Sequence, residues 1–115
     1  MDKLEGYRAI IEQSLTSHLI NWKDQSAIRA AIRDRTVFDR HSDNYLIVRE
    51  GWKNSDRIHA VVVHLELLNG KIWIQEDWLE HGIATDLEEA GIPKSDIVLG
   101  FHPAYIRPHT EYAVA

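Results

Sequence analysis

Cysteine is absent from all 115 residues of the chain. This excludes disulfide bonds, thiolate zinc sites, iron–sulfur clusters and a cysteine nucleophile. Long apolar runs are lacking too, since no stretch approaches the roughly 20 residues that span a bilayer. Residues 1–6 lack the basic region and apolar run of a signal peptide. We therefore expect a cytoplasmic protein with no membrane segment.

The chain has no excess of basic residues: its formal net charge is −5. DNA binding rests largely on Lys and Arg neutralising phosphates, so an acidic balance makes it less favoured without excluding a local basic patch. With 44% hydrophobic and 27% charged residues, the composition is that of a globular protein. The length and the lack of linkers or repeats predict a single domain over residues 1–115.

Hydrophobic periodicity predicts two helices and four strands. Residues 2–18 carry an apolar stripe at helical spacing. A second helix begins within residues 77–82 and ends at Gly91, which is followed by Ile92 and Pro93 as in a Schellman motif. Residues 21–31 fit a loop, a helix or the start of a strand equally well. Extended segments follow at 32–39, 45–52, 57–67 and 71–76, with Asn69-Gly70 as a hairpin signal.

These elements predict an α+β fold. We expect a two-layer sandwich in which an antiparallel four- to five-stranded sheet carries two helices packed on one face. The alternation in residues 45–52 places Leu46, Val48 and Trp52 on one face, and Tyr45 and Ile47 on the other. Residues 110–115 alternate as well, and could add an edge strand or dock on a partner.

Catalytic motifs are lacking. There is no Gly-x-Ser-x-Gly elbow, no glycine-rich phosphate loop and no carboxylate cluster with a nearby lysine of the nuclease type. A site-specific recombinase needs a larger chain with a defined set of Arg, His and nucleophile residues. We therefore predict no catalytic residues, no cofactor and no enzymatic activity.

Seven histidines raise the question of a metal site. His59 and His64 are five residues apart in one strand, and this odd separation predicts opposite faces. His64 and Glu66 share a face, and His102 or His109 could complete a site, which leaves a metal-dependent enzyme as a weak alternative. A structural role for a hydrogen-bonded, half-buried His64 is favoured, and no metal is predicted.

Two surfaces are candidates for binding. Arg33 and Arg35 share a strand face, with Arg49 on the neighbouring strand, and could contact DNA, although a solvated strand face explains them equally well. Trp78, Tyr105 and Tyr112 lie in irregular segments. Aromatic residues exposed there suit a protein interface, because such side chains are enriched at binding hot spots.

Several blocks together resemble one protein family. Gly70-Lys71-Ile72-Trp73-Ile74-Gln75, the run from Ala90 to Pro103 and the closing Thr110-Glu111-Tyr112-Ala113-Val114-Ala115 are similar to the signature blocks of XisI, the fdxN element excision controlling factors of cyanobacteria. The resemblance extends over essentially the whole chain.

The resemblance implies a controlling role in the programmed excision of a DNA element during heterocyst development. It implies a XisH-like protein as partner, and a separate site-specific recombinase in the same process. The leading hypothesis is therefore a non-enzymatic accessory factor that binds a XisH-like protein, and the alternative is a controlling factor that contacts DNA directly. The second face of the sheet could also form a homodimer or another partner surface.

Overall fold

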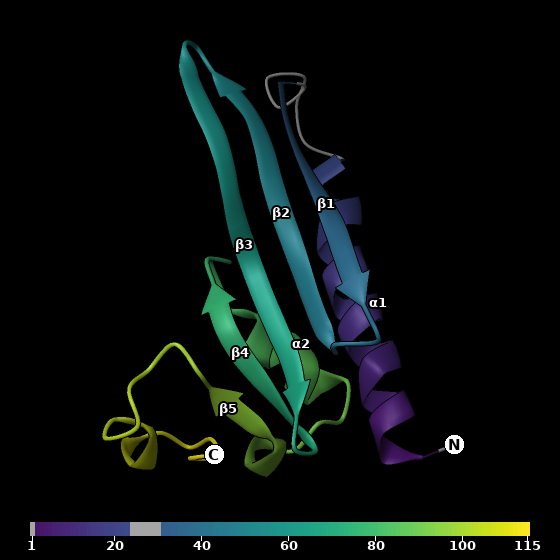
Figure 1. Ribbon diagram of the computed structural model, residues 1–115, viewed down its shortest axis with the longest axis vertical. Helices are drawn as coiled ribbons and strands as arrows, with labels where there is room; N and C mark the ends of the chain where they lie inside the picture. The colour runs from purple at the N-terminus through teal and green to yellow at the C-terminus, as the bar shows by residue number, and fades with distance from the viewer. Residues whose placement is uncertain (1, 24–30) are drawn as a thin grey trace.

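The computed structural model describes residues 2–23 and 31–115, so most of the ambiguous segment 21–31 lies outside the described residues. Five strands form one sheet in the order β1-β2-β3-β4-β5, with two α-helices beside it (Figure 1). The bounds are α1 Lys3–Lys23, β1 Ile32–Asp39, β2 Asn44–Lys53, β3 Asp56–Leu68, β4 Lys71–Asp77, α2 Ile83–Glu89 and β5 Ile97–Leu99.

The first four strands form the antiparallel meander that the sequence predicts. Each is joined to the next by a short turn, and Asn69 and Gly70 both have positive φ, as the predicted Asn-Gly hairpin requires. The fifth strand differs from the expectation. β5 pairs with β4 in parallel, because α2 carries the chain back to the start of β4 before β5 begins. The sheet is therefore mixed.

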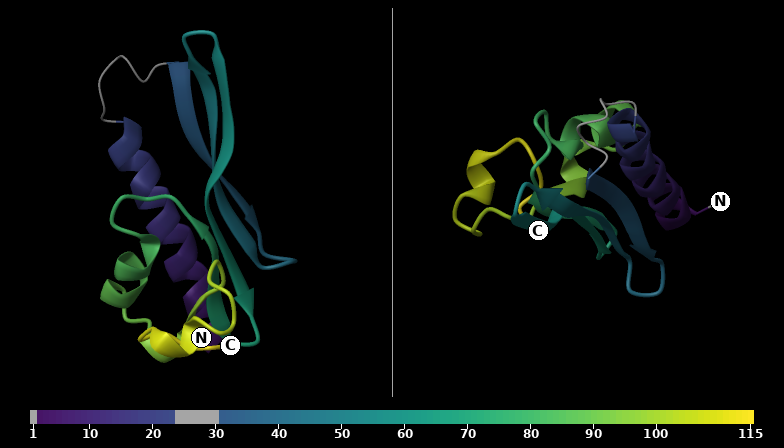
Figure 2. Two further views of the ribbon diagram at one scale, coloured as in Figure 1. Left: turned by 90° about the vertical axis from the view of Figure 1, so that its left-hand side faces the viewer. Right: turned by 90° about the horizontal axis from the view of Figure 1, so that it is seen from above.

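Both helices lie on one face of the sheet, and the other face carries no helix (Figure 2). The covered face provides Tyr45 and Ile47 from β2, which are almost completely buried, as the predicted alternation requires. On α1 the stripe of Tyr7, Ile11 and Leu15 is buried against the sheet. The two-layer α+β sandwich is thus confirmed, with one hydrophobic core between helices and sheet.

The ends of α2 are fixed by polar and backbone contacts. Its first residue, Ile83, donates its backbone N–H to Asp77 Oδ2 at 2.7 Å, so Asp77 caps the helix from six residues upstream. At the other end Gly91 has φ 104° and Ile92 N–H bonds to Leu87 O at 3.1 Å. This is the predicted Schellman motif, in which glycine avoids the steric cost of a left-handed conformation.

A β-bulge in β3 changes the alternation of its side chains. Ile47 pairs with Val63 but Val48 pairs with Val61, so Val62 is an extra residue in β3. As a result His64, opposite Leu46, and His59, opposite Glu50, point to the same face of the sheet. The prediction of opposite faces is wrong for this reason. The two histidines are still separated by about four residues of the neighbouring strand, roughly 13 Å.

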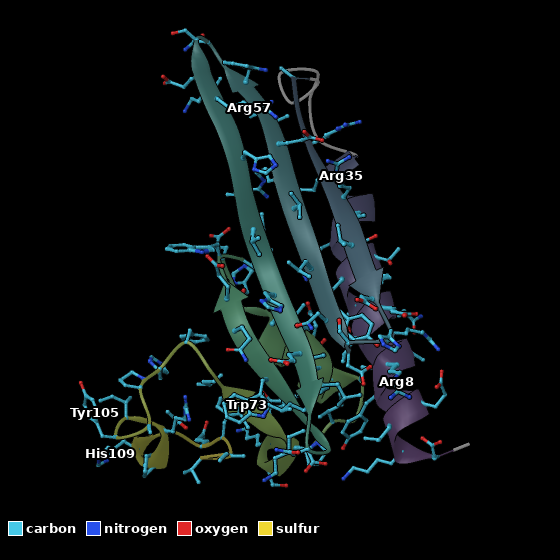
Figure 3. All side chains as sticks on the ribbon, in the orientation of Figure 1. Arg8, Arg35, Arg57, Trp73, Tyr105 and His109 are labelled. Atoms are coloured by element: carbon cyan, nitrogen blue, oxygen red, sulfur yellow. The ribbon has the colours of Figure 1, made fainter. Side chains whose placement is uncertain are left out.

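The C-terminal segment lies beside β5 at the end of the sheet. Ala113 forms a parallel bridge with Val98, and its N–H bonds to Ile97 O at 2.9 Å. The alternating tail therefore adds one bridge to the sheet edge. The segment also reaches the uncovered face, where the Arg107 guanidinium lies 5.1 Å from the centre of the Trp73 ring (Trp73 is labelled in Figure 3).

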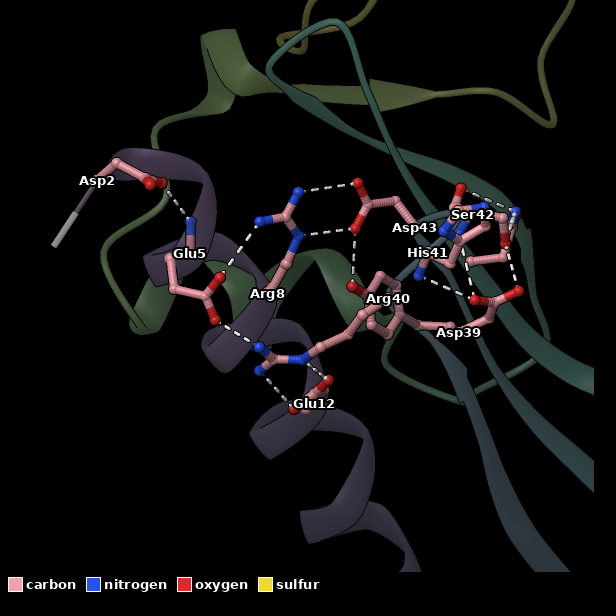
Figure 4. Close-up of polar contacts among 11 residues, drawn as sticks. Asp2, Glu5, Arg8, Glu12, Asp39, Arg40, His41, Ser42 and Asp43 are labelled. Carbon is pink, nitrogen blue, oxygen red and sulfur yellow. Dashed lines mark hydrogen bonds and ion pairs between the residues drawn. The ribbon is translucent and has the colours of Figure 1, made fainter.

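A polar network joins α1 to the turn between β1 and β2 (Figure 4). Arg8 donates to both carboxylate oxygens of Asp43, at 2.8 and 3.1 Å, and Asp43 also accepts a hydrogen bond from the Tyr45 hydroxyl at 2.9 Å. Arg40, from the same turn, bonds to Glu12 and Glu5 on α1. The bidentate arginine pairs fix the helix at a defined position over the sheet.

Replacing Tyr45 with phenylalanine removes one hydroxyl from this network. Tyr45 is completely buried, and the substitution leaves one Asp43 oxygen without that donor. We expect the free energy of unfolding in urea to fall by about 1 kcal/mol. Tyr105→Phe is the matched control and should leave stability unchanged, because Tyr105 is 74% exposed. Equal stability of the two variants would contradict this role for the network.

The same network predicts how stability depends on pH. Hydrogen bonds from Arg8 lower the pKa of Asp43 below its ordinary value of 3.8. A carboxyl whose pKa is lower in the folded state stabilises the fold above its unfolded pKa, and this contribution is lost as pH falls through the folded pKa. Asp43→Asn should therefore be less stable than the parent at pH 7, and the difference should shrink below about pH 4. A difference that is constant from pH 7 to pH 2 would contradict the assignment.

Candidate interaction surface

Within the described chain, the sheet face opposite the two α-helices carries no α-helix, and we call it the open face. Because side chains alternate between the two faces along a strand, about every second residue of each strand lies on the open face. Its members in the first four strands include Arg33, Arg35, Val37, Asp39, Leu46, Val48, Glu50, Trp52, Arg57, His59, Val61, His64, Glu66 and Trp73.

Three arginines surround one carboxylate at the hairpin end of the open face. Glu50 accepts hydrogen bonds from Arg33 at 2.8 and 3.0 Å, and lies 3.0 Å from Arg35 and 3.4 Å from Arg57. The Glu50 side chain is only 14% exposed, whereas the three arginines are about half exposed or more. Hydrogen bonds from Arg33 lower the pKa of Glu50. Three guanidinium groups carry far more donors than one carboxylate can accept, so this cluster can bind a further anion.

Of the residues suggested for DNA contact, the structure brings two together. Arg33 and Arg35 share the open face as expected, and Figure 3 shows Arg35 and Arg57 in the upper half of the sheet. Arg49 lies on the neighbouring strand but on the opposite face, where it forms a bidentate pair with Asp34 at 2.8 and 3.0 Å. Arg57 is the third arginine of the cluster around Glu50, in place of Arg49. Its guanidinium also lies 5.4 Å from the centre of the exposed Trp52 ring.

The other end of the open face has the opposite charge. Glu66 accepts a hydrogen bond from Gln75 at 3.1 Å, and Glu76 accepts one from the Trp78 indole at 2.8 Å. His64 bonds to Asn44 Oδ1 at 2.7 Å, which is the structural role that the sequence favoured. Beside them, Trp73 Nε1 is buried and has no hydrogen-bond partner among residues 2–23 and 31–115.

The three aromatic residues suggested for a partner surface differ in exposure. Trp78 directly follows β4, Tyr105 lies in the C-terminal segment (Figure 3), and each is 74% exposed. Tyr112 instead packs against the core, and its hydroxyl donates to Glu88 at 2.7 Å. This hydrogen bond and burial raise the pKa of Tyr112 to about 12. Trp78 and Tyr105 are thus available for contacts, and Tyr112 supports the tail.

Within the described ranges, no group of three or more His, Asp or Glu side chains lies close enough to hold a metal ion. His64 and Glu66 are bonded to the amides of Asn44 and Gln75, and the His102 ring lies 4.6 Å from that of Phe101. The geometry gives no support to a site formed by His64, Glu66 and His102. No helix in these ranges is long and apolar enough to cross a membrane.

A small cleft of about 240 Å³ lies between the end of α1 and the start of α2. His18 Nε2 bonds to Asp86 at its wall, so a histidine and a carboxylate are paired there. Thr85 is the one hydroxyl residue among those that line it. Among the described residues, no hydrogen bond joins Thr85 to the pair of His18 and Asp86, so no activated nucleophile faces the histidine there.

The described surface is therefore that of an α+β protein with exposed charged and aromatic contact sites, and comparison with known proteins identifies its family. The chain matches the family model described as XisI protein over residues 1–114, and it belongs to the XisI family. A search of curated proteins finds no match.

Two crystal structures from Anabaena variabilis ATCC 29413 share the fold. A XisI-like protein is 29% identical with a TM-score of 0.86, and the fdxN element excision controlling factor XisI is 35% identical with a TM-score of 0.75. Each comparison covers 99% of this chain and 100% of the other. The family expected from the sequence blocks is confirmed.

Proposed function

We propose that this protein is a non-enzymatic controlling factor that binds a XisH-like protein and so controls the excision of a DNA element. Membership of the XisI family supports the proposal, as does the likeness to a protein named as an excision controlling factor over nearly the whole chain.

The observation that carries the proposal is the exposure of two large aromatic residues outside the sheet. Trp78 and Tyr105 are 74% exposed, although burying such a side chain is worth roughly 2 kcal/mol or more. Tryptophan and tyrosine are the residues most enriched at the energetic centres of protein interfaces. Both follow strands at the β4–β5 end of the sheet, away from β1.

Light scattering on a sizing column tests the proposed function itself. The protein is run alone and then mixed with the XisH-like protein encoded nearest to it. A joint peak of defined mass is expected. Separate peaks at micromolar concentrations would contradict the proposal.

Substitution then tests the surface. Trp78→Ala and Tyr105→Ala should each weaken binding to the XisH-like protein by about tenfold or more, because hot-spot truncations cost 2 kcal/mol or more. Trp52→Ala is the matched control: Trp52 is also exposed, at 52%, but lies at the far hairpin end of β2, and its loss should leave the affinity unchanged. If Trp52→Ala weakens binding while the other two do not, the partner binds the open face instead.

Direct DNA contact is the second candidate, and the cluster of Arg33, Arg35 and Arg57 favours it. A gel-shift series in salt tests it. DNA binding through this cluster predicts retardation at low ionic strength that weakens steeply as salt rises. It also predicts loss of retardation in Arg33→Ala/Arg35→Ala, whereas Lys3→Ala, at the start of α1 beside Asp96, keeps it. No retardation even at the lowest salt eliminates this candidate.

A further inference from the structure

An apolar stripe crosses the middle of the open face. Val37 on β1 pairs with Leu46 on β2, and Val48 on β2 pairs with Val61 on β3. Val37 is 46% exposed, and the other three are partly exposed. Both helices lie on the opposite face (Figure 2), so within the described chain the stripe has no helix over it. Apolar area of this kind favours contact with another apolar surface.

Charge is divided across this stripe. Towards the β2–β3 hairpin lie Arg33, Arg35 and Arg57 around the single carboxylate of Glu50. Towards the β1–β2 turn the register places three carboxylates on the same face, those of Asp39, Glu66 and Glu76. They outnumber the two cations at this end, which are Lys71 at the start of β4 and Arg107, which stacks on Trp73. One face thus has a basic half, an apolar centre and an acidic half.

We propose that the open face is a homodimer interface, in which a second copy packs face to face with its strands reversed. The two-fold axis would lie between the sheets, perpendicular to the strands, at the level of the apolar stripe. Each strand then packs over the same strand of the other copy, and aligned sheets of this kind pack about 10 Å apart. The product is a four-layer arrangement, with the helices outside and the two sheets inside.

The register sets which residues meet. The level of Glu50 in one copy lies over the level of Asn44 in the other. On β1 this brings Arg33 near Asp39 of the second copy, and on β3 it brings His59 and Arg57 towards the second Glu66. At the centre, Leu46 of one copy lies over Val48 of the other, with Val37 over the second Arg35 and Val61 over the second His64. The apolar centre of β2 and the charged ends of β1 and β3 are therefore complementary to the same face turned by 180°.

This complementarity favours a second copy over other occupants. A nucleic acid would meet the carboxylates of Asp39, Glu66 and Glu76, and would leave the aliphatic stripe in water. An unrelated protein would need the same alternation of acidic, apolar and basic zones, which a second copy has by symmetry. The dimer also leaves Trp78 and Tyr105 outside the stripe, so it does not depend on the function proposed above.

Sedimentation equilibrium over a range of concentrations tests the dimer. The expected particle has twice the chain mass of 13.3 kDa. Leu46→Asp places a carboxylate against Val48 of the second copy and should raise the dissociation constant by about 100-fold or more, since a buried unpaired charge is costly. Leu4→Asp is the matched control: Leu4 is a leucine, 37% exposed, at the start of α1 on the other side of the sheet. It should leave the dissociation constant unchanged.

Charge exchange tests the reversed orientation. Arg57→Glu and Glu66→Lys should each weaken the dimer by about tenfold, and the double variant should recover most of that loss. Circular dichroism and thermal melting of each variant show whether it remains folded. A monomer at all concentrations would overturn the proposal. A dimer that is unaffected by Leu46→Asp, or that shows no recovery in the double variant, would overturn this face or this orientation.

Discussion

Two helices can cover only one face of this five-stranded sheet, and the rest of the structure follows from that constraint. The covered face holds Tyr45, Ile47 and the other buried residues in one core with α1 and α2. The bidentate pair of Arg8 with Asp43 holds α1 in place over the turn between β1 and β2. Because the core is complete on that side, the residues of the opposite face are free to serve contacts with other molecules.

The bulge at Val62 shapes this second face. Without it, His59 would point towards the helices and Arg57 would leave the neighbourhood of Glu50. With it, the hairpin end of β3 turns its basic residues to the same side as Arg33 and Arg35. The one extra residue in β3 thus brings three guanidinium groups around the carboxylate of Glu50. They lie apart from the acidic residues at the end of the sheet near the β1–β2 turn. The second candidate function, direct DNA contact, rests on this cluster.

Much of the fold could be predicted from periodicity and turn chemistry. The bounds of β1, the Asn69-Gly70 hairpin and the Schellman end of α2 are local features that the structure confirms. β5 was not predicted, because three residues within an apolar segment carry no period, and only pairing with β4 defines them as a strand. The face of His59 depends on the bulge, which nothing in the local sequence of β3 indicates, and the face of Arg49 relative to Arg33 and Arg35 depends on the register of β1 with β2.

In the candidate surfaces too, local features could be predicted, and contacts between distant residues could not. Trp78 and Tyr105 are exposed as their irregular context suggested, while Tyr112 is held by Glu88, a partner 24 positions away on α2. The grouping of Glu50 and Arg57 with Arg33 and Arg35 could not be predicted, because these residues come from three different strands. The only signal in the sequence is that two residues of opposite charge lie on either side of a hairpin. They are diagonal neighbours, since Glu50 pairs with His59 and Arg57 pairs with Trp52.

The interface proposed on the open face can be tested by X-ray scattering from the protein alone in solution. One chain measures 42 × 35 × 25 Å, and Figure 1 views the sheet down the shortest of these axes. Face-to-face packing predicts a particle of twice the chain mass that grows mainly along the 25 Å direction. A particle of single mass, with a radius of gyration near the 15.0 Å of one chain, or an elongated dimer joined at the sheet edges, would contradict it.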